Sequence, residues 1–162
     1  MALPRIDTPT YQLTIPSTGE EISYRPFLVK EQKIIMMAQE SKDDNQMIQA
    51  VGDLVESCTF GKVDAKNSPT FDIEYIFLKI RSKSVGETIE LNVVCPDDEK
   101  TTTPVKIKLD DIKLLSDVRH RTEVDISENI KLNLRYPKLS DMQGIDTNDS
   151  VNAPFQILNN CV

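Results

Sequence analysis

The stretch "SPTFDIEYIFLKIRSKSVGETIELNVVC" (Ser68–Cys95) changes its hydrophobic period part-way along, and this change decides the fold class. Its first half is apolar on most faces and begins with a potential cap residue, Ser68, before a first-turn proline. These features predict a helix that is the most buried one of the chain or that contributes to a protein interface. From Val85 onward apolar and polar residues alternate as far as Cys95, which predicts a β-strand.

A β-hairpin is predicted near the start of the chain. The segments "YQLTI" (Tyr11–Ile15) and "ISYRPF" (Ile22–Phe27) have extended patterns, and the turn residues Ser17, Thr18 and Gly19 lie between them. Pro26 prevents the second strand from continuing as a central strand of a sheet.

Helical spacing predicts two helices between this hairpin and Ser68. In the first, over residues 28–41, Ile34 and Ala38 define an apolar stripe, which three residues widen: Leu28, Ile35 and Met37. In the second, over residues 41–58, the following residues share one face: Met47, Val51, Leu54, Val55 and Cys58. Core filling between these helices is the commoner explanation of three methionines, and an adaptable binding surface is the alternative: Met36, Met37 and Met47.

Two antiparallel hairpins are predicted after the third helix. Val105, Ile107 and Leu109 return beside the strand that ends at Cys95, and a second alternating pair extends over residues 124–136. The predicted fold class is therefore α+β: an N-terminal β-hairpin, a three-helix segment, then two antiparallel β-hairpins, of which the first resembles a metal-free zinc ribbon.

The 162 residues suit one domain of ordinary size. We expect residues 1–84, the N-terminal hairpin plus helical part, to form one continuous domain with the β-hairpin part, residues 85–137. Residues 138–162 form a C-terminal segment, and its abrupt end suggests truncation.

Composition and charge restrict the class of function. The formal net charge of −7 opposes nucleic-acid binding and attraction to an anionic membrane. The N-terminal residues lack the apolar core of a signal peptide, and no apolar run approaches the length of a membrane span. Three widely spaced cysteines suit a reducing compartment, so we expect a cytosolic protein.

Cys95 is the one candidate zinc ligand, and its surroundings favour a buried thiol. A structural zinc site needs four nitrogen or sulfur ligands, commonly from two Cys-x-x-Cys pairs. Here Asp98 occupies the position of the second cysteine, and the returning strand offers threonines at residues 101–103. Cys95 also continues the parity of Leu91 and Val93, which we expect to face inward, so no metal and no cofactor is predicted.

No catalytic motif is present, so the protein is not expected to be an enzyme. The single histidine, His120, has no nucleophile signature to serve, and the paired carboxylates fall at predicted turns and element ends. With five glycines in the chain, no phosphate-binding loop occurs either. We therefore expect no small-molecule substrate.

Protein–protein binding is the remaining activity. The third helix carries more apolar surface than one packing face needs, so Phe71, Tyr75 and Phe77 are candidate partner-binding residues. Arg119, His120 and Arg121 form a basic loop that is expected to touch an acidic partner.

Several segments resemble a known family: "LPRIDTPTYQLTIPSTG", "YRPFLVKEQKIIMMAQES", "FDIEYIFLKIRSKSVGETIELNVVCPDD" and "VKIKLDDIK". Together they extend from about residue 3 to about residue 137 and are similar to the baseplate hub proteins and hub assembly factors of T-even-type tailed phages. The resemblance implies a non-enzymatic structural or assembly role in a contractile tail baseplate, through binding to other hub or tail proteins. It also implies a location in the host cytoplasm during assembly and in the virion tail baseplate. Some relatives carry complete Cys-x-x-Cys pairs in the hairpin of Cys95, a pattern from which this chain departs at Asp98 and at residues 101–103. A degenerate zinc ribbon that binds nucleic acid is the alternative function.

Overall fold

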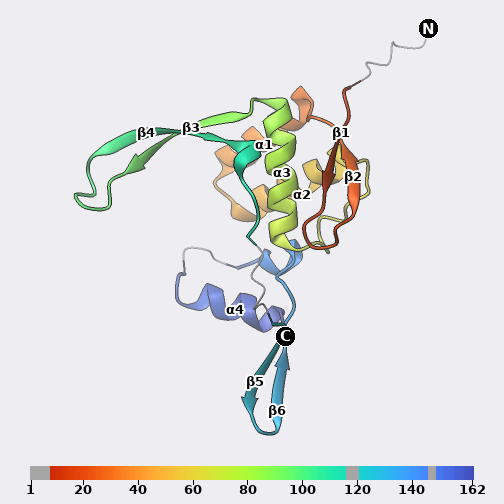
Figure 1. Cartoon of the computed structure of the whole chain (residues 1–162), viewed down its shortest axis with the longest axis vertical. Helices are drawn as coiled ribbons and strands as arrows, with labels where there is room; N and C mark the ends of the chain where they lie inside the picture. Colours follow the sequence, from red (N-terminus) through yellow and green to blue (C-terminus); the bar gives the residue numbers. More distant parts are fainter. Residues whose placement is uncertain (1–7, 116–120, 146–148) are drawn as a thin grey trace.

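The computed structural model describes residues 8–115, 121–145 and 149–162. It confirms the predicted α+β class, with four helices and three two-stranded antiparallel sheets in the described ranges. Figure 1 shows helix α3 in the middle of the body, and two of the hairpins extend away from the body in different directions.

The N-terminal hairpin consists of β1 (Tyr11–Thr14) and β2 (Glu21–Tyr24), as predicted. Its turn brings Gly19 to a φ of 72°, a value that glycine adopts without strain. The carboxylate of Asp72, on α3, accepts a 3.0 Å hydrogen bond from the Ser17 amide and a second bond from the Ser17 hydroxyl. This buried carboxylate therefore fixes the hairpin turn onto the central helix.

Helices α1 (Val29–Ser41) and α2 (Asp44–Cys58) follow with boundaries close to those predicted. A left-handed residue, Lys42, ends α1, and the side chain of Asp43 caps α2 by accepting from the Asn45 amide at 2.9 Å. The predicted face of α2 is confirmed, because Leu54, Val55 and Cys58 are buried.

Helix α3 (Thr70–Ser84) is at the centre of the core. Ile73, Ile76 and Ile80 are each no more than 1% exposed and pack with residues of α2 and of the N-terminal hairpin. The residue that caps the helix is Pro69 and not Ser68, whose hydroxyl instead donates to the carbonyl of Asp64. The reason is that residues 64–67 form a turn that already uses the Ser68 side chain.

The two later hairpins are β3 (Thr88–Val94) with β4 (Thr102–Lys108), and β5 (Glu123–Ser127) with β6 (Ile130–Asn133). A short 3-10 turn, η1 (Leu109–Asp111), buries Leu109 against the body and anchors the first hairpin at its root. Lys79 and Lys83 of α3 reinforce this anchor by ion pairs with Asp110, at 3.5 and 3.6 Å.

The C-terminal segment contains elements that the sequence did not predict: the 3-10 turn η2 (Leu139–Met142) and helix α4 (Asn152–Asn160). Leu139 packs against the core, and the Arg135 guanidinium joins the Asp141 carboxylate to the carbonyl of Asn160. Among the described residues, no helix has the length and apolar character needed to cross a bilayer.

Candidate functional site

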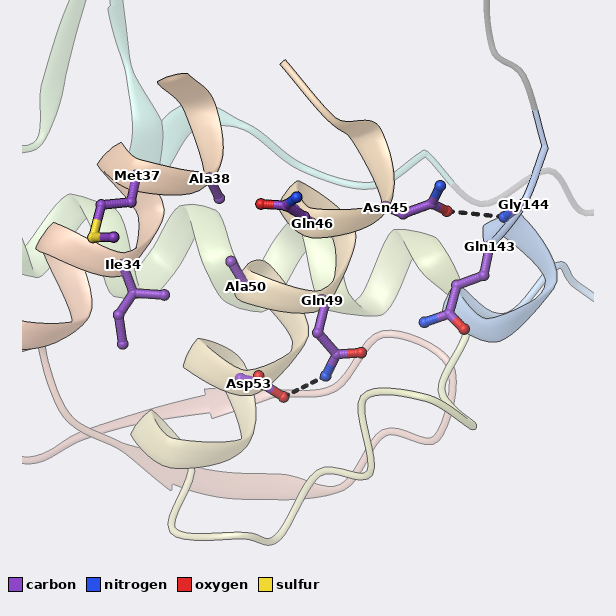
Figure 2. A pocket seen from close by; sticks show the side chains of 10 residues that line it. All are labelled: Ile34, Met37, Ala38, Asn45, Gln46, Gln49, Ala50, Asp53, Gln143 and Gly144. Atoms are coloured by element: carbon purple, nitrogen blue, oxygen red, sulfur yellow. Dashed lines mark hydrogen bonds between the residues drawn. The ribbon is translucent and has the colours of Figure 1, made fainter. Parts of the chain in front are cut away.

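A groove with a volume of about 750 Å³ lies between α1 and α2, and the turn after η2 closes one end (Figure 2). Its floor consists of two buried alanines, Ala38 and Ala50. At the closed end the Gly144 amide donates a 2.9 Å hydrogen bond to the side-chain oxygen of Asn45. The remaining lining residues come from three elements: Ile34, Met37, Gln46, Gln49, Asp53 and Gln143.

This groove is suited to binding and has few groups that could take part in catalysis. Among the described residues that line it, Asp53 alone is titratable, and its carboxylate accepts a 2.7 Å hydrogen bond from the side-chain amide of Gln49. General acid–base catalysis needs convergent titratable groups, whereas small apolar floors with amide walls suit a protein segment. The groove is therefore a candidate docking surface.

The predicted inner stripe of α1 is wrong in part. Ala38 is buried and Ile35 packs against the core, but Ile34 and Met37 are 53% and 60% exposed. Met36 is exposed as well, so filling of the core does not account for it. The helix instead turns Glu31 inward, which a hydrophobic pattern cannot indicate.

The cause is an ion-pair network that joins β2, α1 and α2. The Arg25 guanidinium donates to both oxygens of Glu31, at 2.7 and 3.0 Å, and the hydroxyl of Ser57 donates to the same carboxylate at 2.9 Å. The Leu28 amide donates to it at 2.6 Å. The hydrogen bond from Arg25 is the main reason that the pKa of Glu31 is lowered to about 2, although burial acts in the opposite direction.

The β3–β4 hairpin carries an exposed apolar face. Cross-strand neighbours Leu91 and Val105 lie on it together with Val93, and Leu91 and Val93 are 46% and 49% exposed. The expectation that Leu91 and Val93 face a core is therefore wrong: both side chains are exposed, and the hairpin extends away from the body (Figure 1).

Cys95 ends this face and is half-buried, not buried as predicted. The difference arises because the β3–β4 hairpin projects from the body and does not pack in the core. Asp98, which occupies the position of a second zinc-binding cysteine, closes the tip instead, because its carboxylate accepts from the Thr101 amide at 3.0 Å and from the Lys100 amide at 3.2 Å. A hydrogen bond from the Thr101 hydroxyl is the main reason that the pKa of Asp98 is lowered, and the two amide bonds lower it further.

The aromatic candidates on α3 are all half-buried, and they do not lie together at one site. The Phe71 ring packs edge-on against Tyr136 with centroids 4.9 Å apart, and the ammonium of Lys79 lies 5.4 Å from the Tyr75 ring centroid. Phe77 packs against the core and also lines a hollow of about 490 Å³ at the root of the β3–β4 hairpin, where Leu91 is another lining residue. Of the three aromatic candidates, Phe77 is thus the one that lies next to the exposed apolar face of the hairpin.

Of the basic candidates, Arg119 and His120 lie outside the described residues. Arg121 is exposed and borders a hollow with Glu123 and Asp125, at the start of the β5–β6 hairpin.

Two further apolar surfaces were missed by the sequence analysis. The β5–β6 hairpin exposes Val124, Ile126 and Ile130, and its other face is polar, with Lys131 paired to Glu123. Helix α4 exposes Phe155 and Leu158. The signal for α4 was Asp149, three residues before the helix, whose carboxylate accepts from the Asn152 amide at 3.1 Å, together with the proline of the first turn.

Fold and surface together define a small α+β protein with two projecting hairpins and several exposed apolar surfaces. A protein-family model described as T4 bacteriophage base plate protein matches residues 8–162. The chain therefore belongs to this family and is a structural component of the phage baseplate, in contact with other baseplate proteins. No curated protein and no solved structure matches the chain.

Proposed function

We propose that this chain is a non-enzymatic component of the baseplate hub, either a virion subunit or an assembly factor, and that it acts by binding other hub or tail proteins. The observation that carries the proposal is the uncovered apolar face of the β3–β4 hairpin, with Leu91, Val93 and Val105. An apolar face on a projecting hairpin is typical of a surface that another protein covers.

Two other features support this function. Phe77 and Leu91 line the same hollow, where the hairpin joins the body. A partner that covers Leu91 and Val93 would therefore also contact the aromatic ring of Phe77. The groove between α1 and α2 supplies a second apolar surface with one titratable residue. Further proposed contacts with a partner are Phe71, Tyr75, Arg119, His120 and Arg121. We also propose that residues 85–137 form one domain with residues 1–84.

The geometry of the β3–β4 hairpin does not support the alternative function, a degenerate zinc ribbon that binds nucleic acid. Asp98 is engaged in closing the tip, and the apolar face around Leu91 differs from the basic face that nucleic acid requires. In the described ranges no group of three or more His, Cys, Asp or Glu side chains is arranged to hold a metal ion.

Adjacent valines provide a matched test of the docking face. Val93 and Val94 are 49% and 51% exposed and lie on opposite faces of β3. We expect Val93→Asp to abolish co-purification of baseplate proteins from infected cells, whereas Val94→Asp leaves it intact. Equal recovery of baseplate proteins by the two variants would contradict this docking face.

The choice between virion subunit and assembly factor is decided by quantitative mass spectrometry of purified virions and of tail-assembly intermediates. A fixed copy number in virions identifies a hub subunit. Presence in intermediates alone identifies an assembly factor, and absence from both overturns the hub proposal.

A further inference from the structure

The two edges of the β3–β4 hairpin differ in their ability to bind another strand. At the ends of the ladder the Cys95 amide donates to the Thr101 carbonyl, and the Leu109 amide donates to the Glu87 carbonyl, both at 2.8 Å. Because hydrogen-bonded and non-hydrogen-bonded pairs alternate in an antiparallel ladder, the even-numbered residues of both strands direct their backbone groups outward.

Pro104 obstructs one of these edges. It lies opposite Asn92 in the register, at a position whose amide would point outward from β4, and proline has no N–H to offer. A proline at such a position is a common means of blocking strand addition. The outer edge of β3 has no proline, so its backbone groups at Glu90 and Asn92 are the ones able to accept a further strand.

The sequence of β3 is complementary to itself in one antiparallel register. With Leu91 opposite Leu91 of a second copy, Ile89 meets Val93 and Glu90 meets Asn92, so apolar residues pair on one face and no like charges are opposed. In this register the even-numbered residues form the hydrogen-bonded pairs, as the outward direction of their backbone groups requires.

The neighbouring registers are worse. A register centred on Glu90 opposes two glutamates directly, and one centred on Asn92 pairs fewer residues of β3. In the register centred on Leu91, each Glu90 instead keeps the 2.6 Å ion pair with Lys106 of its own hairpin.

The same register brings opposite charges together beyond the strands. Counting onward from the Leu91 pair places Asp97 of one copy level with Val85 of the other, the residue directly after α3. The tip contributes Asp97, Asp98 and Glu99, and the last turn of α3 contributes Arg81, whereas Lys83 is already paired with Glu87 and Asp110 of its own chain.

We propose that two copies of this chain pair through the outer edges of β3, antiparallel and centred on Leu91, to form a four-stranded sheet with one continuous apolar face. The inference concerns the strand edge and goes beyond the proposed binding of hub proteins to the face. Pairing doubles the apolar face that is available to those proteins.

Cysteine cross-linking tests the register. In a Cys95→Ser background, Leu91→Cys places two thiols at a non-hydrogen-bonded pair, with Cα atoms about 4.5 Å apart. Val105→Cys is the matched control, because Val105 lies opposite Leu91 on the same face but three strand spacings, about 14 Å, from its counterpart. We expect rapid formation of a disulfide dimer by Leu91→Cys alone. Equal rates for the two variants, or no dimer with Leu91→Cys, would overturn the proposal.

A proline substitution tests the edge itself. Asn92→Pro removes an outward N–H from β3, as Pro104 does on β4, and leaves the bonds inside the hairpin in place. By sedimentation, we expect wild-type protein and Asn92→Thr to form a dimer at high micromolar concentration, and Asn92→Pro to remain a monomer with an unchanged circular dichroism spectrum. A wild-type monomer at every concentration, or a dimer of Asn92→Pro, would contradict strand pairing. Neither result affects the binding of hub proteins, which is measured separately in infected cells.

Discussion

Arg25 and Glu31 form a two-bonded ion pair, with a shortest N–O distance of 2.7 Å, whose side chains are 12% and 7% exposed. Arg25 follows β2 directly, Glu31 lies in the first turn of α1, and Ser57, near the end of α2, donates to the same carboxylate. One carboxylate therefore joins three elements of the body.

We expect stability to depend on the charge of Glu31. The pKa of this carboxylate is lowered from 4.5 to about 2, so its stabilising contribution is fully present above about pH 4.5 and is lost as the pH falls toward 2. Glu31→Gln should lower the free energy of unfolding at neutral pH by about 2 to 3 kcal/mol, because it leaves Arg25 without its charge partner. Urea unfolding between pH 2 and pH 7 measures both effects. Glu40→Gln, at an exposed position of α1, is the control; an equal loss of stability in the control would contradict the role of the pair.

Thiol reactivity should separate the three cysteines. Cys58 and Cys161 are buried and Cys95 is half-buried. Burial also raises the pKa of Cys58 to about 11, which disfavours its reactive thiolate. A thiol reagent should therefore modify one cysteine quickly in native protein, and Cys95→Ser should abolish that fast phase. A fast phase that survives this substitution would show that another cysteine is accessible.

The orientation of α1 can be tested by substitutions on its two faces. Ile34→Gln and Met37→Gln replace exposed side chains, so the free energy of unfolding should change by about 0.5 kcal/mol or less. Ile35→Ala removes a side chain that packs against the core, and should cost about 2 kcal/mol or more. Chemical denaturation provides the comparison. Losses of stability at Ile34 and Met37 as large as the loss at Ile35 would support the inward stripe that the hydrophobic pattern predicted.

Phe77 should be required for binding to the baseplate. We expect Phe77→Asp to block complex formation with hub proteins, since it places a charge in the hollow at the hairpin root. Phe77 also packs against the core, so Phe77→Leu serves as the apolar control and circular dichroism confirms folding. A folded Phe77→Asp protein that still assembles would remove this residue from the docking surface.

The elements that were predicted correctly depend on local patterns. The strand alternation around Leu91 and Val105 and the helical spacing of α2 are properties of neighbouring residues. All three predicted hairpins and α2 are confirmed. The inner face of α1 depends on two residues outside the helix, Arg25 just before it and Ser57, which is 26 residues from Glu31, so the periodicity of the helix could not predict it. Alternation also did not show that the apolar face of the β3–β4 hairpin would lie outside the core, because it indicates a face and not what covers it.

Pro104 has a consequence for how far association can proceed. In a pair joined through β3, both outer strands are β4, and each carries this proline at an outward position. Further strands are then disfavoured at either edge, so association is self-limiting and ends at two copies. A protein with exposed apolar strands would otherwise be at risk of open-ended fibre growth.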